Sequence, residues 1–197
     1  MTCNIKLNLA GAIVGSYTNG PGRRVAIWVQ GCTIGCDSCY NKELQPHEPK
    51  YLVDPLHFAD RLIQSARTYD CEGITISGGE PFQQSVALSL LVRNVRLSGL
   101  SIVCFTGYPD HKIIKSTDVA VKELTSNIDV LICGSYNNCR DHQYSWYDPT
   151  DKSIIFLTDR YSCTNFKDPV SFEYILNNNH IYRTGFIDDL SYNDIFK

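Results

Sequence analysis

Three cysteines in the first quarter of the chain are close enough together to hold an inorganic cofactor. Cys32, Cys36 and Cys39 lie within eight residues, directly after an apolar run over 25–29. Thiolates are soft ligands that suit zinc and iron–sulfur clusters. A loop this short can direct three sulfurs toward one small group, so the spacing predicts a metal or cluster site.

A four-iron cluster with one open iron is the interpretation that we favour for this loop. A 4Fe-4S cluster that only carries electrons has a cysteine on each iron, so three cysteines leave one iron free for chemistry. Zinc is the first alternative, with His47 as a fourth ligand, although structural zinc sites normally present their ligands as two pairs. Structural thiols that cluster by chance are the second alternative.

A second group of residues follows the next apolar run of the chain. Gly78, Gly79, Glu80 and Pro81 come directly after the apolar residues of 73–76. Glycines let a backbone approach a ligand closely, and strand-end carbonyls with a glutamate suit an ammonium group. An ordinary turn with an exposed glutamate is the alternative for this segment taken alone.

The elements that must position these residues alternate between strands and helices. Apolar runs predict strands over 25–29, 73–76, 102–105, 128–133, 154–157 and 181–187. Helical spacing predicts helices over 55–68, 84–97 and 117–125, the first beginning with Asp54 as N-cap and Pro55. This alternation is typical of an α/β fold with a mostly parallel sheet covered by crossovers.

The length of 197 residues favours one domain and is too short for a full eightfold barrel, which usually needs about 250 residues. We therefore expect a single domain over 1–197, built as an incomplete parallel α/β barrel or as an open sheet. Ligands of such folds gather at the carboxyl ends of the strands. Segments 30–41, 77–82, 106–108 and 134–136 should consequently share one face.

The two motifs together resemble the radical S-adenosylmethionine (SAM) superfamily, which combines a Cys-x3-Cys-x2-Cys loop with a GGE turn after the next strand. Further blocks resemble the small glycyl-radical activases, and most closely the activating protein of anaerobic (class III) ribonucleotide reductase. These blocks are Gly20 to Arg23, Trp28 to Cys32, Tyr40-Asn41, Thr106 to Tyr108, Ile128 to Gly134 and Phe156 to Tyr161. They extend over about residues 19–161.

This resemblance implies a partial α/β barrel of the radical SAM type that holds a 4Fe-4S cluster and SAM. Reductive cleavage of SAM would give a 5′-deoxyadenosyl radical, which would form a glycyl radical on a partner enzyme similar to class III ribonucleotide reductase. A flavodoxin-type protein would supply the electron. The three cysteines would ligate the cluster and be catalytic.

The resemblance also assigns residues to SAM. The turn from Gly78 to Pro81 would receive the methionyl amine, Tyr40 would form a wall for the adenine, and Thr106 would contact SAM. Arg23 or Arg24 would meet the SAM carboxylate or a negative charge of the partner. The alternatives are a core aromatic for Tyr40, a turn residue for Thr106 and solvated surface positions for the arginines.

The chain departs from the activase pattern at three places. Ser38 stands where many members have an aromatic residue, Cys133 replaces an acidic residue, and 147–152 read YDPTDK. Two other functions therefore remain as hypotheses. One is a small radical SAM enzyme for a small molecule or peptide, such as a natural-product tailoring enzyme or a 7-carboxy-7-deazaguanine synthase, whose Cys-Asp-Thr run differs from Cys39-Tyr40-Asn41. The other is a non-catalytic iron–sulfur or zinc protein.

Composition excludes several other classes of protein. With 18 basic and 21 acidic residues the net charge is −3, and no basic run predicts a nucleic-acid partner. No run approaches the roughly 18 apolar residues that span a bilayer, and no secretory segment begins the chain, so we expect a cytoplasmic protein without a membrane partner. The six scattered cysteines are predicted to be buried apolar thiols: Cys3, Cys71, Cys104, Cys133, Cys139 and Cys163.

Overall fold

A computed structural model gives the structure of the protein and describes residues 5–135, 152–167, 170, 172–177 and 180–185. Its centre is a seven-stranded sheet in the order β3-β1-β2-β4-β5-β6-β7. The strands are β1 (Leu7–Ser16), β2 (Arg24–Val29), β3 (Tyr51–Val53), β4 (Gly73–Gly78), β5 (Ser101–Thr106), β6 (Val130–Cys133) and β7 (Ser153–Phe156). A separate two-stranded sheet contains β8 (Phe172–Asn177) and β9 (His180–Gly185).

The four central strands β2, β4, β5 and β6 are parallel, as the alternation of strands and helices predicts. The outer strands differ from that prediction, because β1, β3 and β7 pair antiparallel at the two sides of the parallel core. The fold is therefore α/β with a parallel central sheet and antiparallel flanks.

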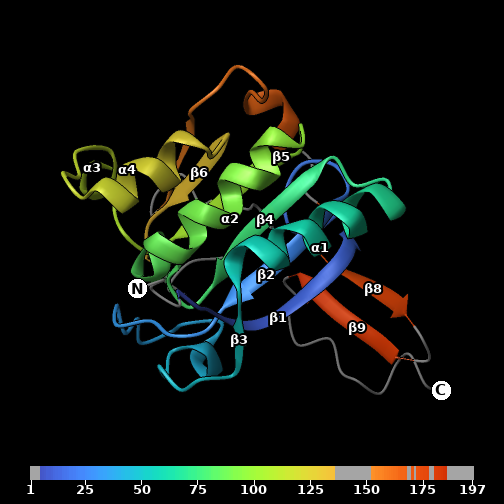
Figure 1. Ribbon diagram of the computed structural model, residues 1–197, viewed down its shortest axis with the longest axis horizontal. Coiled ribbons are helices and arrows are strands. Elements are labelled where there is room, and N and C mark those ends of the chain that lie inside the picture. The colour runs from blue at the N-terminus through green and yellow to red at the C-terminus, as the bar shows by residue number, and fades with distance from the viewer. Residues whose placement is uncertain (1–4, 136–151, 168–169, 171, 178–179, 186–197) are drawn as a thin grey trace.

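Helices cover one face of this sheet. α1 (Pro55–Thr68), α2 (Ser85–Leu97) and α4 (Val119–Ser126) lie side by side across it, with the short α3 (Asp110–Ile114) beside α4 (Figure 1). Apolar side chains of the helices and strands form one buried core between these layers. A smaller cluster on β5, β6 and the segment after β7 includes Tyr161 and Phe166.

Local sequence explains the helix boundaries. The Asp54 carboxylate accepts hydrogen bonds from the N–H groups of Leu56 and His57, both at 3.0 Å, and so caps α1 at the predicted residue. Before α2, Pro81–Gln84 form a short 3-10 helix, η2. In the described part of the chain, no helix is long and apolar enough to cross a bilayer.

The sequence did not reveal β1, the longest strand. Only Leu7 and Leu9 give it an inward-facing apolar alternation, and Gly11 and Gly15 interrupt its later half. Antiparallel pairing with β2 fixes the position of β1, whose own sequence lacks a regular alternation of apolar and polar residues. β3 and β8 were missed for a similar reason, because their side chains are mostly exposed.

Candidate functional site

One cavity of about 460 Å³ opens at the carboxyl ends of the parallel strands. The loops after β2, β4, β5 and β6 all contribute to its wall, which confirms the predicted common face. The lining residues from these loops are Cys32, Ile34, Cys36, Cys39, Tyr40, Asn41, Gly79, Glu80, Gly107 and Gly134. Tyr136, at the end of the last of the four segments, lies outside the described residues.

The cysteine loop is closed at its base by two backbone hydrogen bonds. The N–H of Gly31 donates to the carbonyl of Leu44 at 2.8 Å, and the N–H of Cys32 donates to the carbonyl of Gln45 at 2.9 Å. All three cysteines are partly buried, unpaired with one another, and on the cavity wall. The loop thus presents three thiols to one cavity.

This donor set fits a four-iron cluster better than a single ion. Among the described residues, no three His, Cys, Asp or Glu side chains converge on a point that could hold one metal ion. A cubane binds each thiolate through a different iron, so its ligands surround a volume and need not meet at one point. His47, the fourth ligand of the zinc alternative, is exposed beside Gly31 and is absent from the described cavity wall.

Burial changes the acidity of one of these thiols. Removal from water raises the pKa of Cys32, and the N–H groups of Ile34 and Gly35 partly oppose this effect. Metal ligation requires the thiolate, so binding of a cluster there releases a proton.

The GGE turn is hydrogen-bonded to the entrance of the cysteine loop. The N–H of Gly79 donates to the carbonyl of Val29, and the N–H of Glu80 donates to the carbonyl of Gly31, both at 2.8 Å. A Cβ atom at Gly79 would lie 2.2 Å from the Gly31 oxygen, which only glycine avoids. The two sequence motifs therefore form one structural unit.

Glu80 is completely buried, so the alternative of an exposed turn glutamate is wrong. Its Oε1 accepts from the Phe82 N–H at 2.9 Å and the Thr106 hydroxyl at 2.8 Å, and its Oε2 accepts from the Gly107 N–H at 2.8 Å. Burial raises the pKa of Glu80, and these three donors oppose the rise. A carboxylate has about four acceptor positions, so one position of Oε2 remains for a further donor such as an ammonium group.

The remaining predicted site residues surround this centre. Thr106 is buried, lines the cavity and also accepts the Tyr108 N–H at 3.1 Å. Pro81 is buried as the first residue of η2. Tyr40 is 50% exposed on the cavity wall, so the alternative of a core aromatic is wrong, and its hydroxyl donates to the Gly185 carbonyl at 3.0 Å.

Sequence reasoning missed several further parts of the wall, including Ala10, Gly11 and Ile13 of β1. Thr18 and Asn19 come from the connection between β1 and β2, and residues 183–185 come from β9. A strand near 181–187 was predicted, but no motif linked it to the site, and 186–187 lie outside the described residues.

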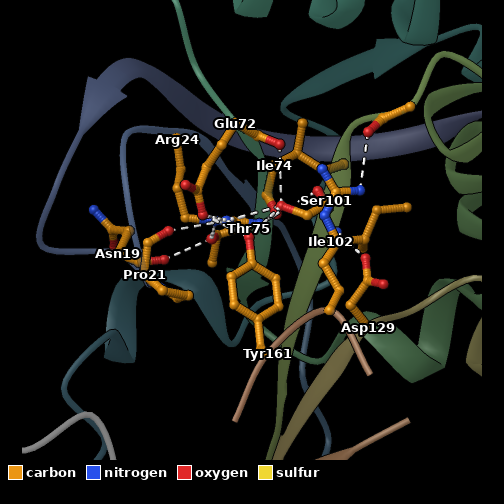
Figure 2. Close-up of polar contacts among 12 residues, drawn as sticks. Asn19, Pro21, Arg24, Glu72, Ile74, Thr75, Ser101, Ile102, Asp129 and Tyr161 are labelled. Atoms are coloured by element: carbon orange, nitrogen blue, oxygen red, sulfur yellow. Dashed lines mark hydrogen bonds and ion pairs between the residues drawn. The ribbon is translucent and has the colours of Figure 1, made fainter. Parts of the chain in front are cut away.

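Arg24 lies neither at the SAM site nor at the solvated surface, the two positions expected for it. It is the first residue of β2 and is fully buried at the amino ends of the parallel strands, away from the cavity. Its guanidinium donates to Thr75 at 2.8 Å, to the Ile74 carbonyl at 2.6 Å and to Ser101 at 3.0 Å (Figure 2). Arg24 is thus a structural residue, and Arg23 is absent from the described cavity wall.

The scattered cysteines follow their prediction in part. Cys71, Cys104 and Cys133 are buried, and burial raises the pKa of Cys133 to about 12, as expected of an apolar thiol. Cys163 is exposed, which corrects the prediction for that residue, because it begins a short 3-10 helix at the surface. Cys3, Cys139 and residues 147–151 lie outside the described residues.

Comparison with known proteins gives the class of the chain. The 4Fe-4S single cluster domain family matches residues 18–154. An anaerobic ribonucleoside-triphosphate reductase-activating protein of Salmonella typhi is 31% identical over 149 residues, covering 71% of this chain and 92% of the relative. The protein of the same name from Enterobacteria phage T4 is 28% identical over 147 residues, covering 73% and 90%.

A putative glycyl-radical enzyme activating enzyme of Haemophilus influenzae is 32% identical over 88 residues, covering 44% of this chain and 33% of the relative. The chain therefore belongs to the family of 4Fe-4S single cluster domains and is a relative of the anaerobic ribonucleoside-triphosphate reductase-activating proteins. The resemblance to the small glycyl-radical activases is confirmed.

Proposed function

We propose that this chain is a radical SAM activase that forms a glycyl radical on a partner enzyme similar to anaerobic ribonucleotide reductase. The observation that carries the proposal is the junction of the two motifs: three thiols and the GGE turn line one cavity and are hydrogen-bonded through Val29 and Gly31. The relatives named as activating proteins support the same assignment.

The proposal assigns a role to each site residue. Cys32, Cys36 and Cys39 hold the 4Fe-4S cluster. When bound, the reduced cluster supplies the electron that cleaves SAM to methionine and a 5′-deoxyadenosyl radical. The strand-end carbonyls and the open position on Glu80 Oε2 orient the methionyl amine of SAM.

Other residues act through position. Thr106 fixes the Glu80 carboxylate, the buried Pro81 begins the 3-10 helix that fixes the turn, and glycines 78 and 79 let the turn approach the cysteine loop. Tyr40 stands on the wall beside the third cysteine, where it suits an adenine ring.

The proposal also extends to the architecture and the surroundings of the protein. The four parallel strands covered by helices on one face support an incomplete α/β barrel of the radical SAM type, formed as one domain over 1–197. A flavodoxin-type donor and a cytoplasmic location complete the proposal, since the chemistry requires a low-potential electron and reduced thiols.

The test is anaerobic turnover of reconstituted protein with SAM and dithionite. We expect 5′-deoxyadenosine from the wild type, and none from Cys36→Ala, because loss of one thiolate leaves the cluster incompletely held. Cys163→Ala is the matched control, since it removes an exposed cysteine outside the cavity. Adding anaerobic ribonucleoside-triphosphate reductase should then produce a glycyl radical signal in electron paramagnetic resonance (EPR).

Failure of the wild type to cleave SAM despite a complete four-iron cluster would refute the proposed chemistry. Cleavage of SAM without any glycyl signal on the partner would instead favour a small-molecule or peptide substrate.

A further inference from the structure

The β8–β9 hairpin forms part of the cavity wall although it follows the range matched by the family. The match ends at residue 154, whereas the hairpin occupies 172–177 and 180–185. Its last three described residues, 183–185, lie on the wall of the cavity, and Gly185 is hydrogen-bonded to Tyr40 of the cysteine loop. The hairpin also stands beside the main sheet as a separate two-stranded unit (Figure 1).

Two anchors hold one side of the hairpin against the β1–β2 connection. The Glu173 carboxylate accepts from the Ser16 hydroxyl at 2.5 Å and from the Tyr17 N–H at 3.0 Å. The Asn19 amide donates to the Thr184 hydroxyl at 2.9 Å. These bonds fix β9 at the rim of the cavity.

The opposite side of the hairpin is exposed and mostly apolar, with Arg183 as its charged residue. Side chains alternate between the two faces of a strand, and the cross-strand pairs Glu173–Thr184 and Tyr174–Arg183 assign the two faces. Thr184 is buried on the anchored face. The other face, which we call the exposed hairpin face, carries Phe172, Tyr174, Leu176 and Ile181, which are 44%, 44%, 77% and 62% exposed.

The outer edge of β9 has backbone groups that point away from β8. The Gly185 carbonyl accepts a hydrogen bond from the Tyr40 hydroxyl and therefore points away from β8. Gly185 pairs with Phe172, so this pair is one in which the backbone N–H and carbonyl of β9 face outward. Hydrogen-bonded and non-hydrogen-bonded pairs alternate in an antiparallel ladder, so Ile181 also directs its N–H and carbonyl outward. In the described ranges β9 pairs with β8 alone, and such an edge is a template for another strand.

We propose that the outer edge of β9 is the docking site for the glycine-bearing segment of the partner enzyme, which binds as an added extended strand. The inference rests on the proposed function. The added strand would pair with the outward backbone groups of Ile181, lead toward the cavity, where Tyr40 occupies the Gly185 carbonyl, and place apolar side chains beside the exposed hairpin face.

The chemistry of the substrate favours this mode of recognition. A glycine offers no side chain to a binding site, so recognition around it must rely on backbone hydrogen bonds. An edge strand supplies such bonds in register, and β9 is the described strand edge that reaches the cavity beside the cysteine loop.

The experiment compares Ile181→Pro with Ile181→Ala. Both remove the exposed side chain, but only proline removes the outward N–H, and edge strands tolerate proline. The probe is the anaerobic ribonucleoside-triphosphate reductase from the same source, with affinity measured by calorimetry and the glycyl radical by EPR. We expect Ile181→Pro to bind the reductase at least tenfold more weakly than Ile181→Ala, with an equal loss of glycyl radical at limiting activase.

A second pair of variants tests the apolar face without touching the backbone. Leu176→Ser removes a leucine that is 77% exposed on the hairpin, and Leu97→Ser removes one that is 79% exposed at the end of α2. We expect only Leu176→Ser to weaken reductase binding, by about threefold to tenfold. Equal reductase affinities within both pairs of variants would overturn the proposal. It would also be overturned if the variants changed only the self-association of the chain, since the edge would then bind a second copy.

Partner-independent formation of 5′-deoxyadenosine separates this proposal from the function on which it rests. The four variants should keep the wild-type rate, because Ile181, Leu176 and Leu97 are absent from the described cavity wall. If the wild type itself does not cleave SAM, the proposed function fails. If cleavage is normal and the variants bind the reductase like their controls, only the docking site fails.

Discussion

One side-chain hydroxyl and one backbone N–H link the GGE turn to the end of the neighbouring strand. Thr106 donates to Glu80 and accepts from Tyr108, so its hydroxyl is the one side-chain donor among the three groups that orient the buried carboxylate. A buried acceptor that loses its donor costs about 1–3 kcal/mol. The effect of Thr106 on SAM should therefore act through Glu80.

Thr106→Val is expected to raise the dissociation constant of SAM about tenfold, since the isosteric change leaves Glu80 with fewer donors. Thr106→Ser retains the hydroxyl and should restore binding to within about threefold of the wild type. Equilibrium dialysis with reconstituted protein measures both constants. Equal affinity of the valine variant and the wild type would show that Glu80 is not positioned by this bond.

Asp129 is a buried carboxylate that ties β6 to its neighbours. It accepts from the Arg96 guanidinium, from the Thr158 hydroxyl at 2.7 Å and from the Ile102 N–H at 2.8 Å. Burial is the largest single influence and raises the pKa of Asp129, but these donors together outweigh it, so the pKa is lowered overall. The ionised form is consequently the one that stabilises the fold.

Because its pKa is lowered in the folded state, Asp129 stabilises the fold fully above pH about 4. This stabilisation is lost as the pH falls through the folded-state pKa. Asp129→Asn should lower the free energy of unfolding by about 2 kcal/mol at pH 7 and flatten its loss in acid. Urea unfolding from pH 7 to pH 3 measures both effects, with the exposed Asp60→Asn as control. An unchanged acid slope in Asp129→Asn would contradict the assignment.

At the scale of elements, the site depends on the close approach of two loops. The turn after β4 passes so near the start of the cysteine loop that Gly79 has no room for a Cβ, although its backbone conformation is ordinary. The clash would be with a backbone oxygen of Gly31, which cannot rotate away. Substitution must therefore separate the loops.

Gly79→Ala is expected to destabilise the protein by about 3 kcal/mol and to reduce iron incorporation, because the turn and the cysteine loop can no longer pair. Gly11→Ala is the matched control for the backbone clash, since a Cβ at that position, although on the cavity wall, meets no atom within 4 Å. Thermal unfolding and iron content after reconstitution measure the two effects. Similar iron contents in the two variants would show that the loops hold the cluster independently.

At the scale of the whole molecule, Arg24 joins segments far apart in the sequence. Besides its bonds to β4 and β5, it donates to the Pro21 carbonyl at 3.1 Å and to the Tyr161 hydroxyl at 3.1 Å, and it pairs with Glu72 at 3.3 Å. Figure 2 shows these groups converging on the guanidinium. Several of its partners are buried carbonyl and hydroxyl groups.

Arg24→Met should lower the free energy of unfolding by about 3–5 kcal/mol, because breaking a buried charged network leaves its partners unsatisfied. Arg61→Met removes an exposed arginine of α1 and should change it by less than about 0.5 kcal/mol. Guanidinium unfolding gives both values. A loss under about 1 kcal/mol for Arg24→Met would mean that water replaces the guanidinium.

The parts of this protein that the sequence determined are local. The thiol ligands, the glycines of the turn and the apolar runs of β2, β4, β5 and β6 each follow from residues adjacent in the chain. Parallel strands joined by crossovers then place successive loops at one edge, so the common site could be predicted without coordinates. The N-cap at Asp54 was equally local.

Only the tertiary structure decided which distant residues meet. The burial of Arg24, the bond from Thr106 to Glu80 and the anchoring of Glu173 on Ser16, 157 residues away, leave no periodic signal in the sequence. Such contacts depend on how the sheet twists and on which side a later hairpin packs. The physical reason is that a residue's type limits its chemistry, whereas its partners are selected by the packing of the entire chain.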